Sequence, residues 1–408
     1  MKPHFKFSAP TFDASAITET IQRALTSAGL TTGHTTGLPT GLPTGLPTGL
    51  PTGLPTGHVR RGADNNVVDV VARVVEERPG AKAEPPHRPA MDEPKTTSGT
   101  FETHAFLQPA GGRAYKLYVP ARLAAAPPLL LMLHGCTQCA DDFAAGTQMN
   151  RLADEHGFLV AYPEQTAQAN SSKCWNWFKA QDQVRHAGEP ALIAGIAREV
   201  AARHGVDTRR IFVAGLSAGA AMAVILGETY PELFAGVGAH SGLPYRSAHD
   251  IPSAMAAMRG GRCGIGGISG VNGVRAMARM ASPDADPGKK LAQPVPTIVF
   301  HGDRDHTVQL SNGIEIAQQA SNALAAASTS AALRASTERG ARAGGRSYSR
   351  TVHTDAAGQV RVESWTVHGA GHAWAGGSQS GSYTDASGPD ASAEMLRFFL
   401  SLPHAGSA

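Results

Sequence analysis

A serine lies at the centre of the stretch GLSAG at residues 215–219, which begins and ends with glycine. The largely apolar run at residues 210–214 is typical of a strand, and residues 220–226 are typical of a helix. A strand, a sharp turn and a helix form a nucleophile elbow, in which glycines allow close backbone approach and the serine hydroxyl projects from the sheet edge. This context predicts acyl transfer by Ser217, with the amide of Ala218 at the helix N-terminus stabilising the oxyanion.

A catalytic serine needs a histidine base and a carboxylate that orients the base. In hydrolase folds they follow in the order serine, acid, histidine. Here the strand-like residues 297–300 precede Asp303 and Asp305, and residues 363–367 precede His368 and His372. Either aspartate and either histidine fits the order. We favour His372, whose small neighbours leave room for its ring, and Asp305, because Asp303 directly after a glycine is typical of a turn.

An oxyanion hole also requires an amide that follows an early strand. Residues 129–133 form a continuous apolar run, which predicts a strand buried on both faces. The chain then continues through His134 and Gly135, where it can turn toward the nucleophile. We therefore expect the amide of Cys136 to be the second oxyanion donor.

Four motifs occur in a fixed order: HGCTQ at 134–138, CWNWF at 174–178, GLSAG at 215–219 and GAGHAW at 369–374. Together they resemble the polyhydroxybutyrate (PHB) depolymerase family of esterases over about residues 100–402. The resemblance implies an α/β-hydrolase fold and hydrolysis of short-chain hydroxyalkanoate esters without a cofactor. It also implies the triad Ser217, Asp305 and His372, and a disulfide between the cysteines of the first two motifs, Cys136 and Cys174.

Cys139 departs from the family pattern, and its CxxC spacing with Cys136 follows a strand instead of opening a thioredoxin-like helix. Trp175, Trp177 and Trp374 lie in the motif loops. They either form an apolar wall for a short acyl chain or pack in the core.

Two other functions compete with this interpretation. Feruloyl and acetyl-xylan esterases have a similar elbow, and the chain ends soon after its last predicted helix, where polymer-degrading relatives often carry a substrate-binding domain. The non-enzymatic alternative is a catalytically silent hydrolase-fold binding protein. It predicts that a serine-directed phosphonate does not label the chain.

Apolar strand-like runs alternate with helical ones from residue 100 onward. This alternation predicts an α/β fold with a mostly parallel sheet covered by helices on both faces. All three catalytic loops then lie at the carboxyl ends of strands, where such sheets bind ligands. Residues 247–294 show no clear periodicity, and we expect either a cap or a surface excursion there. The expected strands are residues 129–133, 158–162 and 211–214, and the expected helices are residues 149–155, 191–204 and 393–400.

The first 99 residues have a different character. The unit Gly-Leu-Pro-Thr repeats over residues 37–56, and proline in every unit excludes a regular helix or ladder strand. Two short helices are expected at residues 13–28 and 66–77, followed by a proline-rich linker. We expect a largely disordered arm over residues 1–99, a catalytic domain over 100–403 and a tail over 404–408. No partner for the arm is identified.

The composition, 42% hydrophobic and 17% charged, is that of a globular protein. A net charge of +3 with scattered basic residues does not indicate nucleic-acid binding, and no apolar stretch is long enough to span a bilayer. The 17 histidines form no metal-ligand motif, so we expect no metal or other cofactor. Residues 1–30 lack the apolar core of a secretory signal, whereas the family resemblance and a disulfide favour secretion.

Overall fold

The computed structural model describes residues 99–403, apart from residue 110 and residues 261–293 and 328–332. The predicted N-terminal helices, repeats and linker lie outside the described residues, as do the tail and most of residues 247–294, where a cap or a surface excursion is expected. The described part of this segment contains helix α6 (Ile251–Met258), which is capped by Asp250, whose carboxylate accepts from the amide of Ser253. No helix among the described residues is long and apolar enough to cross a membrane.

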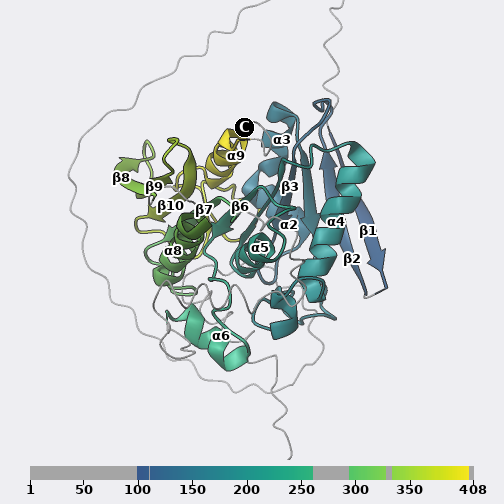
Figure 1. The fold of residues 1–408 in the computed structure, drawn as a ribbon, viewed down its shortest axis with the longest axis horizontal. Helices are drawn as coiled ribbons and strands as arrows, with labels where there is room; N and C mark the ends of the chain where they lie inside the picture. Colours follow the sequence, from purple (N-terminus) through teal and green to yellow (C-terminus); the bar gives the residue numbers. More distant parts are fainter. Residues whose placement is uncertain (1–98, 110, 261–293, 328–332, 404–408) are drawn as a thin grey trace, which may run out of the picture. The chain divides into compact units, whose positions relative to one another are not determined.

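Ten strands of the described chain form one sheet, in the order β1-β2-β4-β3-β5-β6-β7-β10-β9-β8 (Figure 1). The six strands from β4 to β10 in this order pair in parallel, and the pairs at both sheet edges are antiparallel. The strand bounds are β1 Thr100–Gln108, β2 Gly111–Val119, β3 Leu129–Leu133, β4 Leu159–Pro163, β5 Ile211–Leu216, β6 Gly236–His240, β7 Thr297–Gly302, β8 Arg334–Ala341, β9 Ser347–Thr354 and β10 Val360–Val367.

Helices cover both faces of this sheet, as the sequence predicts (Figure 1). Side chains of β3 alternate between the faces: Leu131 packs with one group of helices, and Met132 packs with the other. The first group is α4 (Gly188–His204), α5 (Ala218–Thr229) and α8 (Leu310–Ala327), and the second is α2 (Ala140–Thr147), α3 (Met149–His156) and α9 (Ala391–Ser401). Because both faces are covered, the central strands are apolar throughout.

The edge formed by β8 and β9 is a hairpin that the sequence analysis did not predict. Seven of the eight residues of β8 are exposed, so this strand lacks the alternation of apolar and polar side chains that marks a half-buried strand. The hairpin extends the sheet beyond β10, whose residues Thr366 and Val367 pair with Ser349 and Tyr348 of β9. Short elements complete the described chain: a 3-10 turn, η1 (Ala180–Gln183), and a two-stranded pair, β11 (Trp374–Ala375) and β12 (Thr384–Asp385).

Candidate active site

Ser217 forms the turn between β5 and α5, and its backbone is strained. Its φ of 57° and ψ of −119° lie outside the regions that residues with a side chain usually adopt, at a cost of about 1–3 kcal/mol. The turn is closely packed, because a Cβ on Gly215 would overlap with the backbone of Gly219, and a Cβ on Gly219 would overlap with the carbonyl oxygen of Leu133. Both glycines therefore allow a conformation that holds Ser217 at the carboxyl end of the central strands.

Asp305 and His372, which follow β7 and β10, lie together. His372 Nδ1 is 2.7 Å from Asp305 Oδ2, and the two residues are 4% and 2% exposed. An ionised carboxylate only accepts hydrogen bonds, so Nδ1 carries the hydrogen and Nε2 carries the lone pair. Among the described residues, no hydrogen bond joins Ser217 Oγ to His372 Nε2, and neither atom has a different hydrogen-bond partner. Catalytic hydrogen bonds are often long in free enzymes and shorten when substrate binds.

The other candidate pair, Asp303 and His368, also forms. His368 Nδ1 is 2.9 Å from Asp303 Oδ2, and the amide of Gly369 donates to Asp303 Oδ1 at 2.6 Å. Both side chains are partly exposed, at 38% for His368 and 31% for Asp303. Of these two candidate pairs, only Asp305 and His372 are buried.

Buried contacts hold the carboxylate of Asp305 in its ionised form. Burial alone would raise its pKa, but the interaction with His372 and the hydrogen bonds it accepts outweigh burial and lower the pKa from 3.8 to about 2. Asp305 Oδ1 accepts from the amides of Thr307 and Val308, at 3.0 and 2.8 Å. Asp305 is therefore fixed in position and charge at neutral pH.

The lowered pKa of Asp305 predicts a loss of stability in acid. Because the folded-state pKa lies below the unfolded value, the contribution is complete above about pH 4 and is lost as the pH falls toward 2. It amounts to about 2 kcal/mol. Denaturant unfolding at pH 5 and pH 2 should show the free energy of unfolding falling by that much more in the wild type than in Asp305→Asn. Equal losses in both proteins would contradict this assignment.

Cys136 and Ala218 follow the carboxyl ends of the neighbouring strands β3 and β5. Leu133 of β3 pairs with Gly215 of β5. Cys136 follows Leu133, and Ala218 follows Gly215, at the same distance along the chain. Both residues are at least nine-tenths buried, and neither amide donates a hydrogen bond within the described part of the chain. Buried amides usually have a partner, so two free ones at this edge are suited to bind an oxyanion.

A disulfide joins Cys136 to Cys174 across 38 residues, as the family resemblance implies. Cys139, by contrast, is a free cysteine. The disulfide fixes the strand end that carries the Cys136 amide to the loop that carries Trp175. The two cysteines of the CxxC motif, Cys136 and Cys139, are therefore not bonded to each other.

Removing this disulfide should destabilise the fold. Closing a loop of this length restricts the unfolded chain, so Cys136→Ala/Cys174→Ala should lower the free energy of unfolding by about 2–4 kcal/mol. Urea unfolding measures the change, and Cys139→Ala serves as the matched control, with an expected loss of about 1 kcal/mol or less. A double variant as stable as this control would refute a structural role for the bond.

The three tryptophans of the motif loops are buried. Trp175 and Trp374 are 0% and 1% exposed, and Trp177 is 6% exposed. The indole of Trp175 donates to the carbonyl of His134 at 3.1 Å, and that of Trp374 donates to Ser392 Oγ at 3.0 Å. Their burial favours the packing role over an open apolar wall.

His240, at the end of β6, is a residue that the sequence analysis missed. Its carbonyl oxygen accepts from the amide of Ser217 at 2.9 Å, and its Nε2 accepts from the amide of Ala375 at 2.9 Å. The ring stacks on Trp374 and Phe300, and burial lowers its pKa to about 3, so the ring is neutral. His240 therefore connects the nucleophile elbow to the loop that carries His372. Its place at the carboxyl end of a parallel strand was the available signal.

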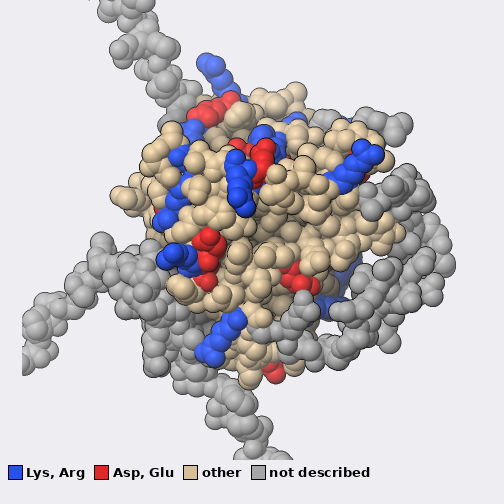
Figure 2. Space-filling view, turned by 90° about the vertical axis from the view of Figure 1, so that its left-hand side faces the viewer, with Lys and Arg blue, Asp and Glu red and all other residues tan. Residues whose placement is uncertain are grey.

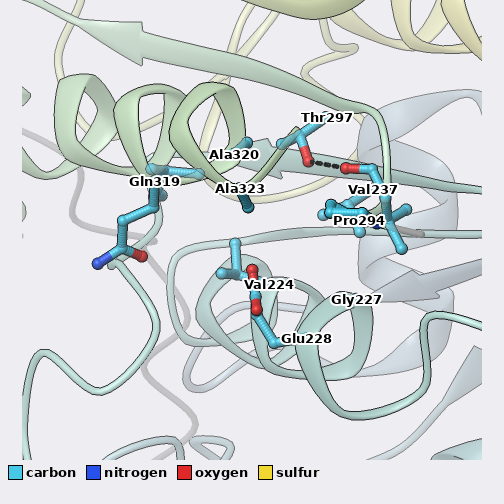
Figure 3. Close-up of a pocket in the computed structure, with 11 residues that line it drawn as sticks. Val224, Gly227, Glu228, Val237, Pro294, Thr297, Gln319, Ala320 and Ala323 are labelled. Carbon is cyan, nitrogen blue, oxygen red and sulfur yellow. Dashed lines mark hydrogen bonds between the residues drawn. The ribbon is translucent and has the colours of Figure 1, made fainter. Parts of the chain in front are cut away.

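A pocket lies at the opposite end of the sheet from Ser217. Val237 and Thr297, near the amino ends of β6 and β7, line it together with residues of α5 and α8. Val224 and Ala323 come from these two helices and lie on opposite sides of the pocket (Figure 3). This pocket contains none of the predicted site residues.

A mostly parallel sheet whose central strand ends in a strained serine defines the α/β-hydrolase class. Residues 113–343 match the model of the family described as Esterase PHB depolymerase. The chain belongs to this family. The matched region contains Ser217 and Asp305 and ends before His372.

Two curated proteins illustrate what the chain is similar to. "Poly(3-hydroxyalkanoate) depolymerase C" of Paucimonas lemoignei is 33% identical over 255 residues, which are 62% of this chain and 57% of that protein. "Probable acetylxylan esterase A" of Aspergillus fumigatus is 33% identical over 165 residues, which are 38% and 43% of the two chains. The chain thus spans about half the length of these curated relatives.

A solved structure, acetyl xylan esterase from Aspergillus awamori, has the same fold. It matches with a TM-score of 0.56 at 20% identity and covers 74% of this chain and 99% of its own. At this identity the similarity establishes the fold class alone.

Proposed function

We propose that the chain is a serine esterase in which Ser217 is the nucleophile, His372 the general base and Asp305 the orienting acid. The observation that carries the proposal is the buried 2.7 Å contact between His372 and Asp305. This contact sets the ring tautomer that a general base needs. It lies at the edge of the sheet formed by the carboxyl ends of the strands, where Ser217 is held in a strained turn. The catalytic domain in this proposal is residues 100–403.

The reaction begins when Ser217 Oγ attacks the carbonyl carbon of the ester and its proton passes to His372 Nε2. Asp305 stabilises the imidazolium, and the amides of Cys136 and Ala218 bind the negative oxygen. The alcohol leaves with the proton from His372, which produces an acyl-enzyme. Water then attacks, again giving its proton to His372, and the acid is released.

The tryptophans support this site in the proposed enzyme. Trp374 stacks on His240 at a centroid distance of 5.1 Å, directly after the loop of His372. Trp175 packs against His134, two residues before the oxyanion amide of Cys136. Because both rings are buried, they act by fixing the loops that carry the base and the oxyanion donor. Trp177, which is 6% exposed, lies next to Trp175 in the second motif.

The proposed substrates are short-chain hydroxyalkanoate esters, in polymeric or oligomeric form. The family match and the depolymerase relative support this class. Acetyl esters of xylan are the second candidate, because an acetylxylan esterase is 33% identical to the chain over the residues compared. Both classes use the same acyl-enzyme chemistry, so the difference lies in how the substrate is bound.

Turnover of three esters by the wild type and by Ser217→Ala tests the proposal. These are a 3-hydroxybutyrate oligomer, acetylated xylan and a feruloyl ester, with p-nitrophenyl butyrate as a general reporter. Serine-dependent hydrolysis that favours the oligomer is the expected result. A preference for acetylated xylan or the feruloyl ester would move the substrate to plant cell walls. If no ester is hydrolysed in a serine-dependent way, the proposal fails and the alternative of a catalytically silent binding protein is favoured.

A further inference from the structure

Outside the proposed catalytic site, a second set of serine, histidine and aspartate side chains is connected by hydrogen bonds. Ser349 Oγ on β9 is 2.9 Å from His368 Nε2, and His368 Nδ1 is 2.9 Å from Asp303 Oδ2. Ser349 comes from the edge hairpin, His368 follows β10 and Asp303 follows β7. None of these residues belongs to the Ser217, Asp305 and His372 set.

The hydrogen-bond roles along this chain of contacts follow from Asp303. Its pKa is lowered, since the interactions with His368 and the amide of Gly369 outweigh the effect of burial, so the carboxylate is ionised and only accepts. His368 Nδ1 must then carry the hydrogen, and in the neutral ring Nε2 accepts. Ser349 is therefore the donor to His368, which is the arrangement that activates a serine in a catalytic triad.

The surroundings hold this arrangement in place and leave it open to solvent. The amide of His368 donates to the carbonyl of Ser347 at 2.9 Å, and the amide of Asp303 donates to the carbonyl of Val367 at 3.1 Å. The side chains of His368 and Asp303 are 38% and 31% exposed, and Ser349 is also partly exposed. A small electrophile in solution can therefore reach this set.

A cationic side chain lies directly opposite the serine. Arg339 of β8 pairs with Ser349 of β9, which puts both side chains on one face of the sheet. Arg339 is exposed and has no side-chain partner among the described residues. Figure 2 views the molecule from the side of this hairpin and shows basic and acidic side chains mixed on that face. A guanidinium in this position can stabilise the negative charge that develops on the oxygen of a group attacked by Ser349.

We propose that Ser349, His368 and Asp303 form a second, slower acyl-acceptor site for activated acyl and phosphonyl donors. With an ester, Ser349 Oγ bonds to the carbonyl carbon, its proton passes to His368 Nε2, and the leaving alcohol takes that proton. Water then hydrolyses the acyl-serine by the same route. With a fluorophosphonate, the new bond is to phosphorus, the serine proton passes to His368 Nε2, and fluoride leaves with the electron pair. Ser349 lies within a strand and not at a nucleophile elbow, so its reaction is slower than that of Ser217.

Labelling in the Ser217→Ala background tests this second site. The protein is incubated with a small fluorophosphonate, and peptide mass spectrometry measures the adduct at each serine over time. We expect a slow adduct on Ser349 that is absent in Ser217→Ala/Ser349→Ala. Adding His368→Gln to Ser217→Ala should slow the labelling by about 100-fold or more, because a positioned general base contributes at least that factor.

Ser336 provides the matched control, since it is an exposed serine of the same hairpin and has no histidine partner among the described residues. Ser217→Ala/Ser336→Ala should label at Ser349 as fast as Ser217→Ala, and thermal melting shows that each variant is folded. No adduct on Ser349, or an adduct that forms equally fast with His368→Gln, would overturn the second site. Neither outcome affects the proposed role of Ser217, because every variant compared carries Ser217→Ala.

Discussion

Ser217→Ala is expected to lower kcat for p-nitrophenyl butyrate by about 10⁴- to 10⁶-fold, the range found when a triad nucleophile is removed. The substitution removes only the hydroxyl oxygen, so the Cβ and the strained turn remain and the protein should fold normally. Initial rates at saturating substrate measure the loss, with Ser336→Ala as a control in an exposed strand. A Ser217→Ala protein that retains more than about 1% of kcat would show that another group performs the attack.

The second large effect separates the two aspartates. Asp305→Asn should lower kcat by about 10⁴-fold, because an amide can donate to His372 Nδ1 and so favours the wrong ring tautomer. Asp303→Asn makes the same chemical change at the other Asp–His pair, whose side chains are partly exposed. We expect it to lower kcat by less than about tenfold.

This pair of variants is informative because the two substitutions are chemically identical and two residues apart. Their kcat values should be measured on one ester at one pH, together with circular dichroism to confirm folding. A large loss in Asp303→Asn with little loss in Asp305→Asn would reverse the assignment of the acid. It would also assign His368 in place of His372 as the base.

The central part of the fold was predictable because its apolar runs are continuous. Residues 129–133 are β3, as predicted, and residues 149–155 lie within α3. Strands buried on both faces leave an unbroken hydrophobic run in the sequence, which is easily recognised. The β8–β9 hairpin was not predicted, since its exposed residues carry no such pattern and its stability comes from pairing with β10.

The site was predictable as far as chain order allows. The elbow motif identified the turn at Ser217, and the strand-like runs placed the candidate aspartates and histidines after two strands, which are β7 and β10 in the structure. Chain order did not separate Asp305 from Asp303, because both loops offer two candidates and both Asp–His pairs form. Ser349 and His240 were missed because their side-chain contacts depend on which strands lie side by side in the sheet, which local sequence patterns do not reveal.

The most direct test of the proposed mechanism is to map the fast reaction of the wild-type chain with a fluorophosphonate. After a brief exposure, peptide mass spectrometry locates the adduct while ester hydrolysis is measured on the same sample. We predict that an adduct on Ser217 appears in proportion to the loss of hydrolysis. Hydrolysis that persists with Ser217 fully modified, or is lost while Ser217 stays unmodified, would contradict its role as the nucleophile.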